Sequence, residues 1–509
     1  MSDVPFESET PAAPNRRNRL VRGGMVMTLV SVANRLSSFV AQLFLGRLLF
    51  EEEFGLFAIA LGLTSLGSAV TSALQPVLID HLENDHAAFD RVYRTTLFMI
   101  SVLVAVAIAA SQWIEGVLNA PGLQPILVVL LAVIPFQVLA GFGMARISHT
   151  MQFGSVGITH TVVPFARHAA TVAFAFLGLG AMSLALGAVV GTAVELVTLA
   201  RYTNPFVRPG LFSRQTLVDV RNATSRFSLE RRQRRWVWLS AIALTLATNG
   251  DYTAASIWGS EELIGIYYFA FALTAAFWLP LNLAVNTVLV PGFIGLRTKV
   301  ERRDRTTETI GTFAVIGVLL FNTVSVTIVP LTHVLWSGKW DAAIPALIGL
   351  SILAPLQFIH PVIHAIQRAT GMWNLYLGDM GAYAVLTVVG AAIAGYMQSL
   401  IAMVVLVVGA ELIVTFTGLI ILAGRFDINP VAIVRQSVTP WILGSVALGA
   451  AHLIHPLDDP SVTGALVRFP VFVALTIALV VIPYRRPMLG IAASLLDDRL
   501  PKFLDSART

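Results

Sequence analysis

The stretches LFMISVLVAVAIAA (Leu97–Ala110), PILVVLLAVIPFQVLA (Pro125–Ala140) and VVLVVGAELIV (Val404–Val414) decide the fold class, because together they contain one charged residue. Similar blocks recur along the whole 509-residue chain, which is 56% hydrophobic and only 12% charged. A soluble domain carries about 25% charged residues. Blocks this apolar need lipid as their solvent, so the sequence predicts an all-α membrane protein.

A bilayer is crossed by about 20 apolar residues in a helix, and on this measure the chain divides into about 14 transmembrane helices. Internal prolines, which membrane helices tolerate, predict kinks at Pro135, Pro164, Pro280 and Pro355. The predicted spans are 23–46, 54–79, 94–114, 124–146, 157–178, 182–201, 236–257, 263–290, 309–332, 342–366, 373–395, 399–422, 437–454 and 465–484.

The basic residues predict the orientation of these spans, because Lys and Arg favour cytoplasmic loops. With the N-terminus inside, every inner segment contains arginine, and the inner loop 202–235 is the longest and most basic. Its part 216–230 is predicted either as a basic amphipathic helix on the membrane surface or as a solvated linker. The outer loops contain Arg47 and Lys339 but are otherwise acidic. The alternation predicts cytoplasmic tails at both ends, a disordered one at 1–22 and another at 485–509.

Several function classes find no support in the sequence. There is no cysteine, which excludes disulfides and thiolate metal sites, and no nucleotide-binding or hydrolase motif. The outer loops are too short for a catalytic domain, so no enzyme activity and no cofactor is predicted. The basic residues follow the membrane topology, so no nucleic-acid partner is predicted either.

Charges inside spans are the candidate functional residues, because a charge in hydrocarbon costs about 2.5 kcal/mol or more. Arg35 and Arg167 lie near the middle of the first and fifth spans. A guanidinium is a fixed charge whose planar donors suit phosphate oxygens, so both are candidate pyrophosphate ligands. The alternative for Arg167 is an internal pair with Glu195. Arg468, near the outer end of the last span, is expected to extend to the interface and is assigned no function.

Other polar residues are candidates for cavity lining or ion coupling. His360 and His364 have the i, i+4 spacing of metal ligands, but the sequence shows no third ligand, so a hydrogen-bonded pair or cavity lining is favoured and no metal is predicted. Asp251 is a candidate proton or cation site. The full set is Glu195, Asp251, Asn282, Asn286, His360, His364, Asp379 and Glu411.

Three stretches of the chain resemble a known family. They are AQLFLGRLLFEEEFGLFAIAL (Ala41–Leu61), the segment Asn249–Pro291 that begins NGDYTAASIWGSEELIGIYYFAFAL, and GKWDAAIPALIGLSILAPLQFI with the following RATG (Gly338–Gly371). In this order and spacing they are similar to the motifs of the Wzx-type oligosaccharide flippases. These are also called polysaccharide biosynthesis proteins and belong to the MOP superfamily with the MATE transporters and the lipid II flippases.

The resemblance implies two pseudo-symmetric six-helix lobes, at 23–201 and 236–422, joined by the loop 202–235 and followed by two further helices at 423–484. It implies a cationic cavity, alternating access and a bacterial cytoplasmic membrane. The implied substrate is an undecaprenyl-pyrophosphate-linked oligosaccharide, with membrane lipids, a polysaccharide polymerase and a chain-length regulator as further partners. Family members tend to have cavity arginines on spans one and eight. Arg35 fits the first, whereas span eight offers Asn282 and Asn286, and Arg167 is the candidate replacement.

The leading interpretation is therefore a flippase for exopolysaccharide, capsule or O-antigen synthesis. A MATE-type multidrug/cation antiporter is the alternative that the acidic span residues favour, and a lipid II flippase is a further alternative from a more similar family. A membrane-embedded glycan polymerase would need a large extramembrane loop, and a non-transporting scaffold would not need buried arginine.

Overall fold

The computed structural model describes residues 30–484 except 31, 32, 35, 36, 85, 150–152, 204–230, 295, 297, 457 and 458, and for parts of its helices it describes the backbone only. Within this part of the chain all regular structure is helical, as predicted. The helices are α2 (Glu51–Asn84), α3 (His86–Leu118), α4 (Leu123–His149), α5 (Phe153–Phe176), α6 (Met182–Ala200), α8 (Arg231–Ala255), α9 (Glu261–Ile294), α10 (Lys299–Trp336), η1 (Asp341–Ala343), α11 (Ile344–Gln357), α12 (Ile359–Ala369), α13 (Trp373–Tyr396), α14 (Leu400–Arg425), α15 (Pro430–Ile454), α16 (Val462–Thr476) and η2 (Ile477–Val481).

Each predicted span from the second onward coincides with helix, and the tail and loop predicted at 1–22, 216–230 and 485–509 lie outside the described residues. Eight helices of the described part are long and apolar enough to cross a membrane on length and composition alone. The protein is therefore a multi-pass membrane protein.

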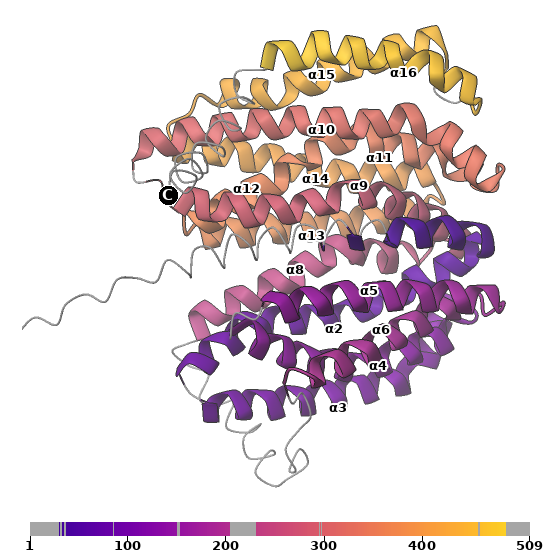
Figure 1. The fold of residues 1–509 in the computed structure, drawn as a ribbon, viewed down its shortest axis with the longest axis vertical. Coiled ribbons are helices and arrows are strands. Elements are labelled where there is room, and N and C mark those ends of the chain that lie inside the picture. The colour runs from indigo at the N-terminus through magenta and orange to yellow at the C-terminus, as the bar shows by residue number, and fades with distance from the viewer. Residues whose placement is uncertain are drawn as a thin grey trace, which may run out of the picture.

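The helices form two groups (Figure 1), which we call the N-terminal bundle (α2–α6) and the C-terminal bundle (α8–α16). Within the first, α2 packs on α4 and α5 packs on α6; within the second, α8 packs on α13 and α10 packs on α11. Contacts of α2 with α8 and α9 join the bundles. Helices α15 and α16 lie at the edge of the C-terminal bundle against α10.

The first turns of α2 and α9 meet backbone to backbone, because a glycine stands at the contact on each side. A Cβ on Gly55 would lie 2.0 Å from the carbonyl oxygen of Glu261, and a Cβ on Gly265 would lie 1.7 Å from that of Glu51. Neither distance leaves room for any side chain. This reciprocal contact, which we call the seam, joins the EEEFG and EELIG motifs of the two bundles.

The residues before α2 form hydrogen bonds with the end of α10 and the turn that follows it, next to the seam. Trp336 and Trp340 donate their indole N–H groups to the carbonyls of Leu43 (3.0 Å) and Gly46 (2.8 Å). Lys339 Nζ donates to Leu49 O at 2.6 Å, and Arg47 Nε donates to Leu335 O at 2.7 Å. The two basic residues that depart from the predicted charge alternation thus hold the bundles together.

The predicted tenth span is two helices rather than one, and Pro361 explains the break. Proline has no N–H to donate to the carbonyl four residues earlier, here Gln357, and its ring crowds that carbonyl. The helix α11 ends at Gln357 and α12 begins at Ile359. By contrast α4 and α5 continue through Pro135 and Pro164. The short α12 places both candidate histidines inside the C-terminal bundle, where its residues from 362 to 367 are buried.

The prediction that Arg468 extends to the membrane interface is wrong, because its side chain is completely buried. Its Nε donates to Val326 O of α10 at 3.2 Å, and its terminal nitrogens donate to the carbonyls of Pro456 and Asp459 in the loop before α16. These carbonyl oxygens replace water as hydrogen-bond acceptors, which explains how the charged guanidinium of Arg468 can be buried. Arg468 therefore joins α16 to α10 and to its own preceding loop.

Candidate functional site

Three of the predicted site residues lie outside what the structure describes. Arg35 falls in the undescribed positions of the first span, and the side chains of Asn282 and Asn286 fall in the part of α9 described by its backbone only. The other predicted residues divide into two places. Arg167 and Glu195 lie in the N-terminal bundle, and Asp251, His360, His364, Asp379 and Glu411 lie in the C-terminal bundle.

The position of Arg167 on α5 depends on two glycines of α6. A Cβ on Gly187 would lie 1.8 Å from Thr171 Oγ1, and a Cβ on Gly191 would lie 3.0 Å from Arg167 Cβ and 3.4 Å from its Cδ. Small residues four apart allow membrane helices to approach this closely. The aliphatic stem of Arg167 therefore runs over Gly191, and α5 packs closely on α6 at these two glycines.

The guanidinium of Arg167 forms no ion pair with any carboxylate in the part of the chain that the structure describes. Arg167 is exposed and Glu195 is half-buried, and among the residues that the structure describes no carboxylate forms an ion pair with this arginine. Its electrostatic interactions extend to Glu195 on α6 and to Tyr268 on α9 of the other bundle. The predicted Arg167–Glu195 pair is thus an electrostatic interaction between groups that are not in direct contact.

Asp251 of α8 is buried and held by hydrogen bonds to neutral groups. Its carboxylate accepts from Tyr267 Oη of α9 at 3.1 Å and from the backbone N–H of Tyr252 at 3.0 Å. Tyr252 packs edge-on against Tyr268, whose ring also contacts α2 through Phe54 and Phe57. Asp251 is therefore hydrogen-bonded to the group of aromatic residues that packs where the two bundles meet.

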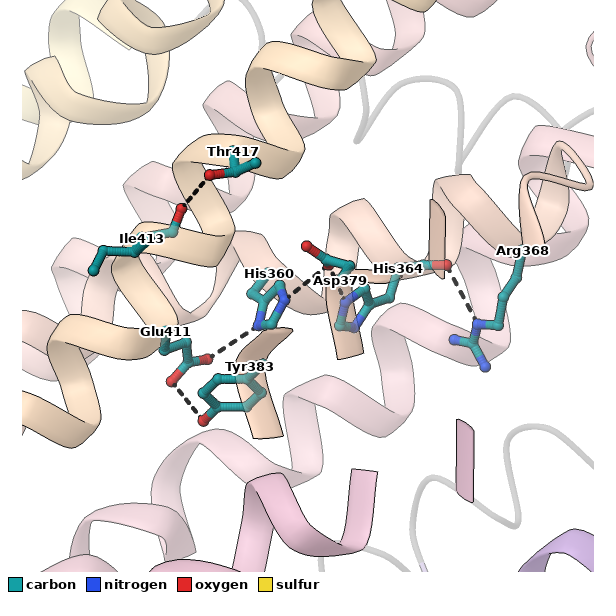
Figure 2. A network of polar contacts seen from close by, with 8 residues as sticks. All are labelled: His360, His364, Arg368, Asp379, Tyr383, Glu411, Ile413 and Thr417. Carbon is teal, nitrogen blue, oxygen red and sulfur yellow. Dashed lines mark hydrogen bonds and ion pairs between the residues drawn. The ribbon is translucent and has the colours of Figure 1, made fainter. Parts of the chain in front are cut away.

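Four of the predicted residues form one buried cluster, which we call the histidine–carboxylate cluster (Figure 2): His360 and His364 of α12, Asp379 of α13 and Glu411 of α14. Both imidazole Nε2 atoms approach the same oxygen, Asp379 Oδ2, at 3.1 Å from His360 and 2.6 Å from His364. The two rings are 4.1 Å apart. All four side chains are at most 11% exposed.

The second nitrogen of His360 faces the other carboxylate. His360 Nδ1 lies 3.6 Å from Glu411 Oε1, and Tyr383 Oη donates to Glu411 Oε2 at 3.3 Å. Arg368, one turn after His364, donates Nε to the His364 carbonyl and places its guanidinium over the Tyr376 ring, away from Asp379 in Figure 2. Each polar group of the cluster is therefore oriented by a neighbour on a different helix.

Sequence reasoning missed the tyrosines of this region. Tyr383 follows Asp379 by one helical turn on α13, and Tyr376 precedes it by three residues, so all three share a face. That spacing was visible in the sequence. The pairing of Asp379 with the two histidines was not, because it depends on how α12 and α13 pack.

Comparison with known proteins agrees with this architecture. The family described as polysaccharide biosynthesis protein matches residues 44–345. The lipopolysaccharide biosynthesis protein WzxC of Escherichia coli K12 is 25% identical over 343 residues, which is 64% of this chain. The chain spans 65% of the length of that relative.

Two solved structures share the fold. One is the lipid II flippase MurJ in an inward closed conformation, with a TM-score of 0.70 and 13% identity over 90% of this chain and 99% of MurJ. The other is an inward-facing MATE multidrug transporter of the MOP superfamily, with a TM-score of 0.59 and 16% identity over 81% of this chain and 99% of that one. The resemblance of the three sequence stretches is thereby confirmed, and the chain belongs to the polysaccharide biosynthesis protein family.

Proposed function

We propose that this protein is a flippase that moves undecaprenyl-pyrophosphate-linked oligosaccharide units across the bacterial cytoplasmic membrane for exopolysaccharide, capsule or O-antigen synthesis. The family match and the likeness to WzxC support this substrate class. In this proposal the chain crosses the membrane about 14 times with both ends inside. The lobes 23–201 and 236–422 open the cavity between them to one side of the membrane at a time, and the seam closes it on the outer side.

The observation that carries the proposal is that Arg167 is exposed and has no ion-pair partner among the described residues. A pyrophosphate cannot enter hydrocarbon unaided, because desolvating its charge is prohibitive. An exposed guanidinium in the middle of a span, with its stem fixed over Gly191, offers two parallel donors to phosphate oxygens. Arg35 is the second proposed ligand. With the cell interior negative, outward movement of an anionic headgroup is favoured by about 2.3 kcal/mol per charge per 100 mV.

A MATE-type antiporter remains the alternative that the acidic residues would favour. A cationic drug needs carboxylates that face the cavity. Asp379 accepts from two histidines, and Asp251 accepts from Tyr267 Oη and from the backbone N–H of Tyr252. These carboxylates are buried, so we propose ion coupling, rather than drug binding, as their role. The choice between a lipid II substrate and an oligosaccharide substrate rests on the relative WzxC.

The test is complementation of a strain that lacks this gene and therefore its surface polysaccharide. Arg167→Ala should reduce surface polysaccharide at least about tenfold, since a charged hydrogen bond contributes about 1.5–3 kcal/mol. Arg35→Ala should also reduce surface polysaccharide at least about tenfold. Arg167→Lys should retain partial export, because lysine keeps the positive charge but lacks the two parallel N–H donors of the guanidinium.

The matched control is Arg201→Ala, which removes an exposed charge at the end of α6. Protein amounts are compared in isolated membranes. Normal export by Arg167→Ala at equal protein level would reject the proposed anion site. Export of a cationic dye by the wild-type protein would favour the antiporter.

A further inference from the structure

The histidine–carboxylate cluster has a feature that transport of an anionic lipid does not require. Two imidazole nitrogens and one carboxylate oxygen converge in a buried space, and these three atoms all lie within 4.8 Å of one another. The histidines alone were insufficient for a metal prediction, and Asp379 from the neighbouring helix supplies the missing third group. We propose that His360, His364 and Asp379 bind one divalent transition-metal ion of the Zn²⁺ class, with Glu411 as the partner that orients His360.

The distances are close to those a metal needs. Zn²⁺ binds imidazole nitrogen and carboxylate oxygen at about 2.0–2.1 Å in a tetrahedron, which places neighbouring ligand atoms about 3.3 Å apart. Asp379 Oδ2 lies 3.1 Å from His360 Nε2 and 2.6 Å from His364 Nε2. Both contacts of Asp379 Oδ2 are therefore within about 1 Å of the spacing between neighbouring ligand atoms of a tetrahedral ion.

The surroundings of His360 match those of a metal ligand. A metal-bound imidazole typically uses its second nitrogen to contact a carboxylate, which fixes the ring orientation. His360 directs Nε2 to Asp379 and Nδ1 to Glu411 Oε1 at 3.6 Å. Glu411 is in turn bound by Tyr383 Oη. The orienting carboxylate and its own support are both present.

The charges of the cluster favour a dication. With neutral imidazoles, Asp379 and Glu411 are two negative charges at 7% and 11% side-chain exposure. Buried charges of one sign are costly unless an opposite charge balances them. Arg368, near the end of α12, places its guanidinium over the Tyr376 ring. The nitrogen and oxygen ligands together select a borderline ion such as Zn²⁺ over Mg²⁺ or Ca²⁺, which prefer oxygen alone.

The site is close to the end of its helices. His364 is five residues from the last residue of α12, or about 8 Å along the axis, and the loop to α13 follows. The side chain of His364 is 11% exposed, the most open of the three ligands. A bound ion would join α12 to α13, and through Glu411 it would hold α14.

The experiment uses the full chain, purified in detergent without a polyhistidine tag and stripped with a chelator. It is then dialysed against ZnCl₂ or CoCl₂. The wild-type protein should retain about one metal ion per chain by elemental analysis, and Co²⁺ should give the visible absorption of a tetrahedral nitrogen–oxygen site. His364→Ala and Asp379→Asn should each lose this stoichiometric ion, and Glu411→Gln should bind it about 10–100-fold more weakly.

The matched control is His455→Ala. His455 Nε2 lies 3.1 Å from Asp459 Oδ2, so this pair repeats the histidine–carboxylate contact near the surface without a second histidine. Its removal should leave the stoichiometry unchanged. A wild-type protein that retains no metal, or a His364→Ala variant that binds as tightly as wild type, would overturn the proposal. The wild-type measurement stands even if a variant fails to fold. Neither result bears on export through Arg167, so the metal site and the flippase function fail separately.

Discussion

Arg167 and Arg468 both lie in predicted membrane spans, yet their environments are opposite. Arg468 is completely buried, and its guanidinium donates to carbonyls of α10 and of the loop before α16. Arg167 is exposed, its stem lies on Gly191, and no described carboxylate pairs with it. The comparison teaches that an intramembrane arginine with a complete set of protein acceptors is structural. An intramembrane arginine whose N–H donors lack protein acceptors is a candidate to bind a ligand.

The largest effect on stability is expected at Arg468. Arg468→Met removes the donors of three carbonyls and should lower the stability of the purified protein by about 3 kcal/mol. Arg167→Met should leave stability near wild type, since this side chain forms no such hydrogen bonds to the residues that the structure describes. The measurement is the apparent Tm of each variant in detergent. Equal Tm values for the two variants would remove the distinction on which this comparison rests.

Sequence reasoning reached the fold more completely than the site. Apolar blocks and basic loops were sufficient to locate the helices, because lipid imposes length and composition on each span. The prediction for Arg468 was wrong, since one of its acceptors lies on α10, about 140 positions earlier in the chain, and sequence periodicity does not reveal such a contact. For the same reason His360 and His364 were identified as a pair, whereas their meeting with Asp379 was not foreseen.

The seam provides the next test, because it opposes any separation of the bundles. Gly265→Ala would place a Cβ 1.7 Å from a backbone carbonyl of α2, so the first turns of α2 and α9 must move apart. The chain has no cysteine, so Ala270→Cys, at a completely buried position of α9, gives a single maleimide target. Gly265→Ala should accelerate its labelling at least about tenfold, which corresponds to about 1.4 kcal/mol.

The control for the seam is Gly409→Ala, because an added Cβ at Gly409 meets no atom within 4 Å. Labelling of Ala270→Cys in that background should match the parent. Unchanged labelling in the Gly265→Ala background would mean that the α2–α9 contact does not hold the seam closed.

A smaller effect is expected at Gly191, which supports the stem of Arg167. Gly191→Ala would place a Cβ 3.0 Å from Arg167 Cβ, so the arginine must shift by a few tenths of an ångström. Overpacking of this kind costs about 1 kcal/mol, and export should fall about fivefold, less than for Arg167→Ala. Surface polysaccharide is the readout, again with Gly409→Ala as control. Full export by Gly191→Ala would indicate that Arg167 needs no fixed stem.

The smallest effect is expected at Lys299 and Asp427, whose charged groups lie 3.4 Å apart with side chains 77% and 73% exposed. Water solvates both groups whether or not they pair, so Lys299→Ala should change stability by no more than about 0.5 kcal/mol, and less at high salt. The measurement is the apparent Tm at two salt concentrations. A decrease as large as that of Arg468→Met would mean that the short distance itself stabilises the chain. A negligible decrease would support the reasoning applied to the two arginines, in which burial and the number of acceptors decide what a charged side chain contributes.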